Sequence, residues 1–165
     1  MPLTPFHWSI LVLGLVFFGS LYLPALAVSS VLMDLEPFYY MFIAPNPDGV
    51  LHGFFHTYIG ASLVALMVGF FLIRFRKPAD WLMGELNLKQ SEISDSKIWF
   101  SSFLGAFSHI FLDSLMHFDL KPFWPVSSQN PFLELVSISD IYAATGIGLV
   151  FVLVLGVFRI FTKAK

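Results

Sequence analysis

The chain contains no cysteine, which excludes disulfides, thiolate metal ligands and cysteine nucleophiles. Any metal ion that it binds must therefore be held by histidine, carboxylate or backbone oxygen atoms. Charge is also scarce, because Asp, Glu, Lys and Arg make up only 12% of the 165 residues. That share is about half of what soluble domains carry. No basic stripe with interleaved aromatic residues is present, so we expect no nucleic-acid partner.

Apolar residues dominate instead, at 57% of the sequence, and twenty of them are phenylalanine. This composition predicts an integral membrane protein whose residues 1–165 form a single membrane-embedded domain. The first residues lack a basic region, and the apolar stretch that follows is too long for a signal-peptide core. We therefore do not expect the N-terminus to be cleaved.

Residues 6–33 carry no Asp, Glu, Lys or Arg, but Gly19-Ser20 and Pro24 interrupt the run. One interpretation is a hairpin of two short helices, at about residues 6–19 and 22–34. The alternative is a single kinked helix of about 26 residues, which is also long enough to cross a bilayer. The two interpretations place His7 at opposite membrane surfaces.

Three further apolar segments have the length of membrane helices. The sequence predicts an all-α polytopic membrane helix bundle, an N-terminal helical hairpin followed by three transmembrane helices. The predicted spans are residues 51–73, 97–118 and 141–158, joined by polar connections at 78–96 and 119–139. Pro37 is expected to end the N-terminal helices and to begin a loop over residues 38–50. A short amphipathic helix is expected around Trp81.

The segment from Ser108 to His117 carries the most informative spacing in the chain. His109, Asp113 and His117 follow one another at intervals of four residues. On a helix each such step turns only about 40° around the axis, so the three side chains share one stripe. Two imidazoles and a carboxylate on one stripe suit a divalent transition metal such as zinc.

Basic residues are distributed very unevenly over the predicted topology. Only Lys121 falls on one side, whereas the other side carries Arg74, Arg76, Lys77, Lys89, Lys97, Arg159, Lys163 and Lys165. Cytoplasmic segments of membrane proteins carry such an excess of Lys and Arg. We therefore expect a protein of the cell (inner) membrane with residues 75–96 and the C-terminus in the cytoplasm.

This topology, with the hairpin, gathers every histidine at the outer membrane face. His7, His52, His56, His109 and His117 then lie at one depth with Asp34, Glu36 and Asp113. Imidazoles and carboxylates without a basic counter-ion predict a bound cation. Zinc is favoured, with manganese or iron left open. The donors exceed one tetrahedral site, so one to three ions are expected, with Asp113 as a bridge.

Two other residues keep more than one interpretation. Glu36 is a candidate metal ligand, a candidate general base or a polar helix end. Lys121 is the one basic residue expected outside and is placed to meet a substrate phosphate, although an interfacial lysine that extends to the headgroups is the simpler interpretation.

Several motifs together resemble a known family, the YdjM-type membrane-bound metal-dependent hydrolases. They are Thr4-Pro5-Phe6-His7, Asp34-Leu35-Glu36, His52-Gly53-Phe54-Phe55-His56-Thr57, Ser108-His109 with Asp113 and His117, and Lys121-Pro122-Phe123-Trp124-Pro125. The resemblance covers residues 4 to 127. One departure concerns the end of the second helix, where the family pattern is closer to Asp-x-Asp-His and this chain has Asp34-Leu35-Glu36-Pro37.

The resemblance implies a metal site like that of the zinc-dependent phospholipase C and single-strand nuclease superfamily, to which the family is distantly similar. In that superfamily such residues bind a three-zinc cluster that cleaves phosphodiesters. By resemblance, the ligands here are His7, Asp34, His52, His56, His109, Asp113 and His117.

Three functional hypotheses follow. The first is a hydrolase that cleaves a phosphoester of a lipid or lipid-linked substrate with metal-activated water, with Asp34, Glu36 and Asp113 as catalytic residues. The second is a membrane protein that binds or transports metal without hydrolysis, which the crowding of ligands at one end disfavours. The third is a structural membrane protein with an architectural metal.

Overall fold

The computed structural model describes residues 4–90 and 92–162. Within these ranges the chain is helical and has no strand, so the predicted all-α class is confirmed. Lys163 and Lys165, which the charge count includes, lie outside the described residues. The elements are η1 (Thr4–Ile10), α1 (Leu11–Val16), α2 (Leu23–Ser29), η2 (Leu32–Asp34), α3 (Leu35–Phe42), η3 (Phe54–His56), α4 (Tyr58–Arg74), α5 (Arg76–Glu85), α6 (Asp95–Ser114) and α7 (Ile138–Thr162).

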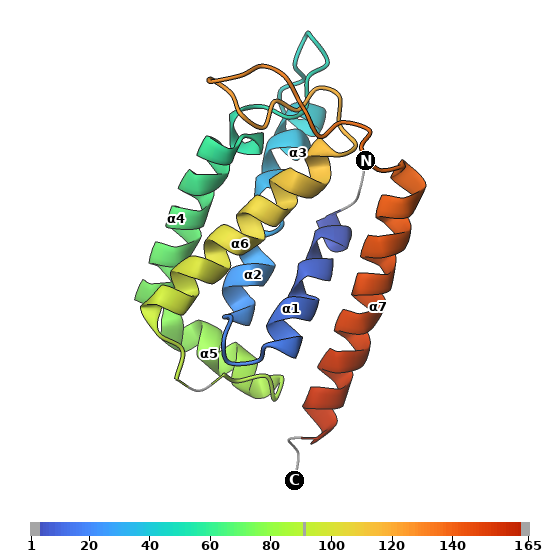
Figure 1. Cartoon of the computed structure of the whole chain (residues 1–165). Helices are drawn as coiled ribbons and strands as arrows, with labels where there is room; N and C mark the ends of the chain where they lie inside the picture. Colours follow the sequence, from blue (N-terminus) through green and yellow to red (C-terminus); the bar gives the residue numbers. More distant parts are fainter. Residues whose placement is uncertain (1–3, 91, 163–165) are drawn as a thin grey trace.

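Helix α6 runs through the middle of the bundle (Figure 1). It packs against α4 on one side and against α2 on the other. Helix α7 contacts η1 and α1 instead, so the N-terminal arm lies between α7 and the rest of the bundle. The arm that carries His7 is therefore held from two directions.

The N-terminal segment folds as the predicted hairpin and not as one kinked span. The chain reverses between α1 and α2 at Gly19, whose φ of +90° favours glycine. Pro24 follows in the first turn of α2, where a proline is tolerated. His7 consequently returns to the neighbourhood of Asp113, with His7 Nε2 3.2 Å from Asp113 Oδ1.

Helix α4, which corresponds to the predicted span 51–73, begins at Tyr58, seven residues later than the sequence predicts. Carboxylates instead accept hydrogen bonds from backbone N–H groups of residues 51–53 and 55. Asp119 accepts from the amides of Leu51 and His52, and Glu36 accepts from those of Gly53 and Phe55. The expected placement of His52 and His56 in one helical turn is therefore wrong: His52 lies in a loop and His56 in η3.

Two other boundaries also differ from the prediction. Helix α6 ends at Ser114, so His117 lies beyond it and only His109 and Asp113 share its stripe. Pro37 does not end a helix but lies in the first turn of α3. Backbone N–H groups in the first turn have no intrahelical acceptor, so proline removes no hydrogen bond there. Residues 38–42 are accordingly helical, whereas the sequence predicts a loop over residues 38–50.

Close approach of α2 and α6 positions the candidate site. A Cβ atom at Gly105 would lie 2.9 Å from the carbonyl oxygen of Leu26 and would also overlap the Ser29 side chain, so only glycine fits. This contact brings the C-terminal end of α2 against α6. The carbonyl of Ser30 then reaches the imidazole of His109 on the facing helix, with Ser30 O 2.8 Å from Nδ1.

Among the described residues, one helix has the length and apolar composition of a membrane span, α7. Helices α4 and α5 pass the same test only together, and they are bent by 80° at their junction. The 20-residue α6 carries the buried His109 and Asp113 in its last turns. The described residues thus contain one clear candidate span, and a bundle of three spanning helices stays a prediction.

Candidate metal centre

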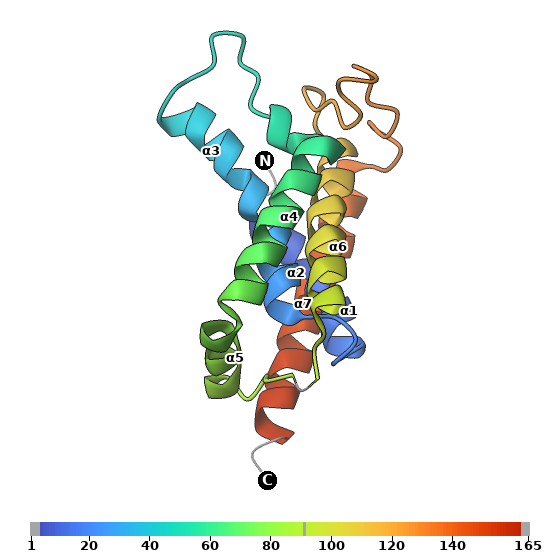
Figure 2. The same ribbon diagram turned by 90° about the vertical axis from the view of Figure 1, so that its left-hand side faces the viewer.

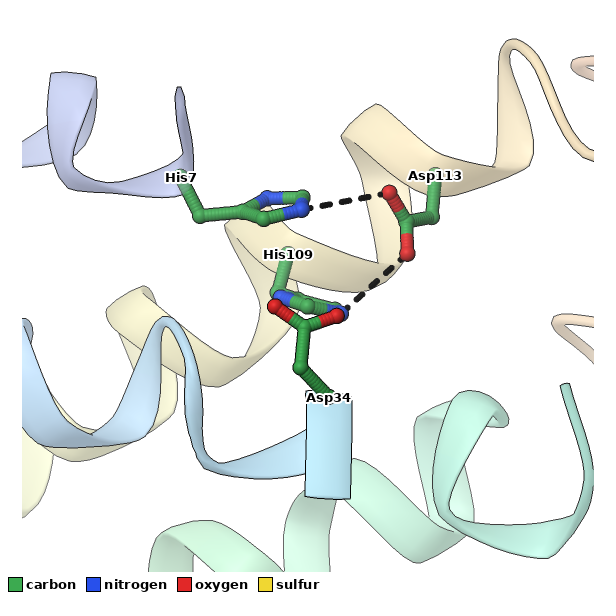
Figure 3. Close-up of side chains that lie close together, drawn as sticks. All are labelled: His7, Asp34, His109 and Asp113. Atoms are coloured by element: carbon green, nitrogen blue, oxygen red, sulfur yellow. Dashed lines mark ion pairs between the residues drawn. The ribbon is translucent and has the colours of Figure 1, made fainter. Parts of the chain in front are cut away.

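Four side chains from three separate segments meet at the centre of the site. His7 comes from η1, Asp34 from the end of η2, and His109 and Asp113 from successive turns of α6 (Figure 3). His7 and His109 stack with ring centroids 3.9 Å apart. Each of the four offers a ligand atom within 4.8 Å of the others, so they could hold a metal ion.

The hydrogen bonds of two histidines fix where their protons lie. His109 Nδ1 faces the carbonyl oxygen of Ser30 at 2.8 Å, and His56 Nδ1 faces Glu36 Oε2 at 2.9 Å. A carbonyl and a carboxylate oxygen can only accept, so both Nδ1 atoms carry the hydrogen. In the neutral imidazoles the Nε2 atoms then carry no hydrogen, and they face each other 3.2 Å apart. Two lone pairs at that separation repel unless a proton or a metal cation lies between or beside them.

Asp113 lies among the imidazoles with both oxygens turned toward them. Its Oδ1 is 3.2 Å from His7 Nε2 and 3.9 Å from His117 Nε2. Its Oδ2 is 3.2 Å from His109 Nε2 and 3.7 Å from His56 Nε2. A carboxylate whose two oxygens face different histidine pairs has the arrangement of a bridge between two cations.

A second group of donors adjoins the first. His52 Nδ1 is 2.9 Å from Asp119 Oδ1, and the His52 ring lies 4.3 Å from that of His117 and 4.7 Å from that of His56. Metal-binding histidines characteristically donate their other N–H to a carboxylate or a backbone carbonyl, which fixes the tautomer and the ring orientation. His52, His56 and His109 all have such a partner.

Unsatisfied polar atoms indicate that the side chains fit metal ions. The buried atoms without a hydrogen-bond partner in the described part of the chain are His7 Nδ1 and Nε2, Asp34 Oδ2, Asp113 Oδ1 and His117 Nε2. Leaving such atoms without a partner costs free energy. Ligands about 2.0–2.1 Å from a tetrahedral zinc lie about 3.3 Å from each other. The separations of 3.2 to 3.9 Å around Asp113 are close to that value.

Two groups in the loop after α6 have perturbed acidity. Burial lowers the pKa of His117 to about 4, and the charge of Asp113 offsets this only in part. The imidazole is therefore neutral at pH 7, the form in which it binds metals. Burial alone would raise the pKa of Asp119, but hydrogen bonds from His52 and from two backbone amides lower it far below its usual value. Asp119 is therefore ionised.

The structure brings all seven predicted ligands together. Together with Asp119 they form three overlapping groups of potential ligands, His7, Asp34, His109 and Asp113; His52, His56 and Asp113; and His52, His117 and Asp119. Asp119 is not among the ligands predicted from the sequence, although it lies only two residues after the candidate ligand His117. Glu36 belongs to none of the groups, and its carboxylate accepts from His56 Nδ1 and from the amides of Gly53 and Phe55. No sequence signal could have revealed the Ser30 carbonyl.

Comparison with protein families gives a match over almost the whole chain. The sequence model of the family described as YdjM inner membrane protein matches residues 4–164. The chain belongs to the YdjM inner membrane protein family. Searches of curated proteins and of solved structures give no match.

The YdjM family is a family of inner membrane proteins, and in this chain the structure adds groups of His and Asp side chains that could hold a metal ion. The charged ends of the helices agree with the asymmetry of the sequence. Helix α5, the start of α6 and the end of α7 lie at one end of the molecule, and the loops after α3 and α6 lie at the other (Figures 1 and 2). The direction in which this YdjM protein crosses the membrane stays a prediction.

Proposed function

We propose that this YdjM-family protein is a membrane-bound, metal-dependent hydrolase that cleaves a phosphoester of a lipid or lipid-linked substrate at the outer membrane face. One observation carries the proposal. The Nε2 atoms of His7, His56 and His109 converge on Asp113, and the Nδ1 atoms of His56 and His109 are already committed to acceptors. Such a set of donors accommodates divalent cations.

The all-nitrogen and oxygen ligand set favours zinc, with manganese or iron as alternatives. His7, Asp34, His109 and Asp113 would hold one ion, and His52, His56, His117 and Asp119 offer ligands for a second or third beside Asp113. Bound divalent ions lower the pKa of water and polarise a phosphoryl oxygen, which is the chemistry that phosphoester cleavage requires.

The carboxylates have different environments and therefore different proposed roles. Asp113 is buried and would bridge the ions. The Asp34 side chain keeps 20% of its surface exposed, and its Oδ2 has no hydrogen-bond partner, so it is the carboxylate best placed to take a proton from water. Both oxygens of Glu36 already accept hydrogen bonds, from His56 and from backbone amides, so we assign Glu36 a positioning role.

A cavity beside the centre supports a lipid substrate. It has a volume of about 440 Å³, lies between α3 and α4, and is lined mainly by apolar residues such as Leu32, Met33 and Met67. Glu36 also lines it, and the Glu36 carboxylate is hydrogen-bonded to His56, so the cavity is next to the metal donors. Helix α3 diverges from the bundle next to this cavity (Figure 2) and exposes Leu35, Phe38 and Phe42. An acyl chain would find apolar surface next to the metal donors.

The alternatives are a metal-binding or metal-transport protein and an architectural metal. A transport path would require ligands through the bundle, whereas the groups of potential ligands in the described residues all share the end of α6 near Asp113. The core between α4 and α6 toward the other end consists of residues such as Val64, Ala65 and Val68. An architectural metal would leave the substitutions that follow without effect on turnover.

The test combines metal analysis with a substrate assay on the purified full-length protein. Wild type is expected to contain bound zinc and to release phosphate or a phosphorylated headgroup from phosphatidic acid or phosphatidylglycerol. Asp113→Asn is expected to lose most of the metal and at least about a hundredfold of the activity, as removal of essential catalytic groups does. Asp48→Asn, on the exposed part of the loop after α3, serves as the matched control. Wild type without stoichiometric metal would refute the proposal, and bound metal without turnover of any phospholipid would favour the architectural role.

A further inference from the structure

A second, more polar cavity opens beside the metal donors. It has a volume of about 230 Å³, and its lining includes His52, Phe54, Asp119, Lys121 and Trp124. His52 and Asp119 belong to the candidate metal ligands, so a molecule in this cavity would reach a cation held there. The cavity is too small for a bulky ligand but has room for a phosphate group with a few attached atoms.

Two hydrogen-bond donors in this lining have no acceptor. In residues 4–90 and 92–162, neither the Lys121 ammonium nor the Trp124 indole N–H has a hydrogen-bond or ion-pair partner. The Trp124 ring itself packs edge-on against Phe54, with centroids 6.3 Å apart. This contact restrains the ring, which is 46% exposed, on the side of the cavity lining.

The one carboxylate in the lining does not neutralise Lys121. Asp119 Oδ1 faces His52 Nδ1 at 2.9 Å, and Oδ2 accepts from the amides of Leu51 and His52 at 2.9 and 3.1 Å. No ion pair joins Asp119 to Lys121 in the described structure. Hydrogen bonds from three donors already stabilise the Asp119 charge, which leaves the lysine charge available to a ligand.

We propose that this cavity is the subsite for the anionic phosphate headgroup of the substrate, with Lys121 and Trp124 as its recognition residues. Lysine recognises phosphate as a point charge, and the indole N–H adds one directed hydrogen bond. The inference rests on the proposed function, because it assigns part of that function's substrate to this cavity. It also changes the interpretation of Lys121 from an interfacial anchor to a specificity-determining residue.

Phosphate of this kind occurs in a lipid headgroup and in a water-soluble phosphoester. The test therefore measures binding of two probes to zinc-loaded, full-length protein, glycerol 3-phosphate in detergent and phosphatidic acid in phosphatidylcholine nanodiscs. Lys121→Met is expected to weaken binding about tenfold or more, as loss of a charged hydrogen bond does. Lys121→Arg is expected to stay within about threefold of wild type, because it keeps the charge. Lys77→Met, at the far end of the bundle, controls for net charge.

Binding that weakens for both probes supports a subsite for phosphate from either source, and weakening for phosphatidic acid alone supports a lipid headgroup. Unchanged binding in Lys121→Met, or an equal loss in Lys77→Met, would overturn the inference. Metal content is measured in every variant and is expected to equal that of wild type. If wild type binds the probes through Lys121 but hydrolyses no phosphoester, the proposed hydrolase function fails while the subsite stands. If it hydrolyses them with Lys121→Met unchanged in Kd and KM, the subsite fails alone.

Discussion

At the scale of single residues, the partners behind the histidines decide what the histidines can do. His52, His56 and His109 each have one ring nitrogen on a carboxylate or carbonyl oxygen. In the neutral imidazoles this leaves Nε2 of His56 and His109 without a hydrogen and directed at Asp113. The sequence predicts the imidazoles but not these partners. Asp119 is 67 residues from His52, Ser30 is 79 residues from His109, and Glu36 is 20 residues from His56.

Substitution of Glu36 tests this arrangement. Glu36→Gln replaces an oxygen with an NH₂ group that cannot accept, so it cannot serve His56 Nδ1 and the amides of Gly53 and Phe55 together. Loss of such a partner typically lowers metal affinity about 10- to 100-fold. Competition with a chromophoric zinc chelator measures the affinity. Glu85→Gln, on the exposed surface of α5, is the matched control and is expected to bind zinc as wild type does. Equal affinities in all three proteins would contradict the positioning role.

The acidity of His117 gives a second prediction at this scale. Burial lowers its pKa to about 4, whereas the imidazole of an unfolded chain titrates near pH 6.5. Between these values the unfolded state binds more protons, so the free energy of unfolding of the metal-free protein falls as the pH is lowered from 6.5 to 4. Below about pH 4 the contribution of His117 no longer changes.

Thermal unfolding in detergent with a chelator measures this dependence. The melting temperature of wild type is expected to fall more steeply between pH 6.5 and 4 than that of His117→Asn, which has no imidazole to protonate. Parallel curves for the two proteins would show that the acidity of His117 is not perturbed by folding.

At the scale of elements, contacts with carboxylates accompany the late start of α4. The apolar run from Leu51 suggests a helix, but Asp119 and Glu36 accept from the amides of Leu51, His52, Gly53 and Phe55, and α4 starts only after the Thr57 cap, which accepts from the Gly60 amide. A residue-by-residue pattern cannot reveal these contacts, because Asp119 is more than sixty residues away.

The contact between α2 and α6 is an element-scale feature that one substitution can test. Gly105→Ala would push Leu26 and Ser29 away from α6, and such overpacking costs about 1–3 kcal/mol. Because Ser30 follows on the same segment, zinc affinity is expected to fall as well. Gly84→Ala, where a Cβ meets nothing within 4 Å, is the control and is expected to be neutral or to gain about 0.5–1 kcal/mol. Thermal unfolding and zinc titration of the two variants measure the effects; a Gly105→Ala protein as stable as Gly84→Ala would contradict the close contact.

At the scale of the whole molecule, the two ends of the bundle differ in charge and in chemistry. The absence of cysteine makes a direct test of orientation simple, since a single introduced thiol is the only one present. Ser96, at the start of α6, and Ser128, in the loop beyond its end, are both exposed.

In intact cells, a membrane-impermeant maleimide is expected to label Ser128→Cys and not Ser96→Cys, because the basic end should face the cytoplasm. After the cells are permeabilised, both variants are expected to react, which controls for accessibility. Labelling of Ser96→Cys alone in intact cells would invert the topology and place the metal centre on the cytoplasmic side.

The sequence by itself determined the class of protein and the residue types of the site. Scarce charge and long apolar runs predicted a helical membrane protein. Backbone N–H and C=O groups find no water in the bilayer, and a helix satisfies them within one segment. The absence of cysteine restricted any metal to nitrogen and oxygen donors, and the spacing of His109 and Asp113 placed both on one helix face.

The tertiary structure decided which groups complete the site and how they are oriented. Only the reversal at Gly19 returns His7 to Asp113, and only the loop after α6 brings Asp119 to His52 and Lys121 to the polar cavity. These are contacts between segments far apart in the chain. Their positions depend on helix packing and on contacts between carboxylates and backbone amides, which local sequence patterns do not encode.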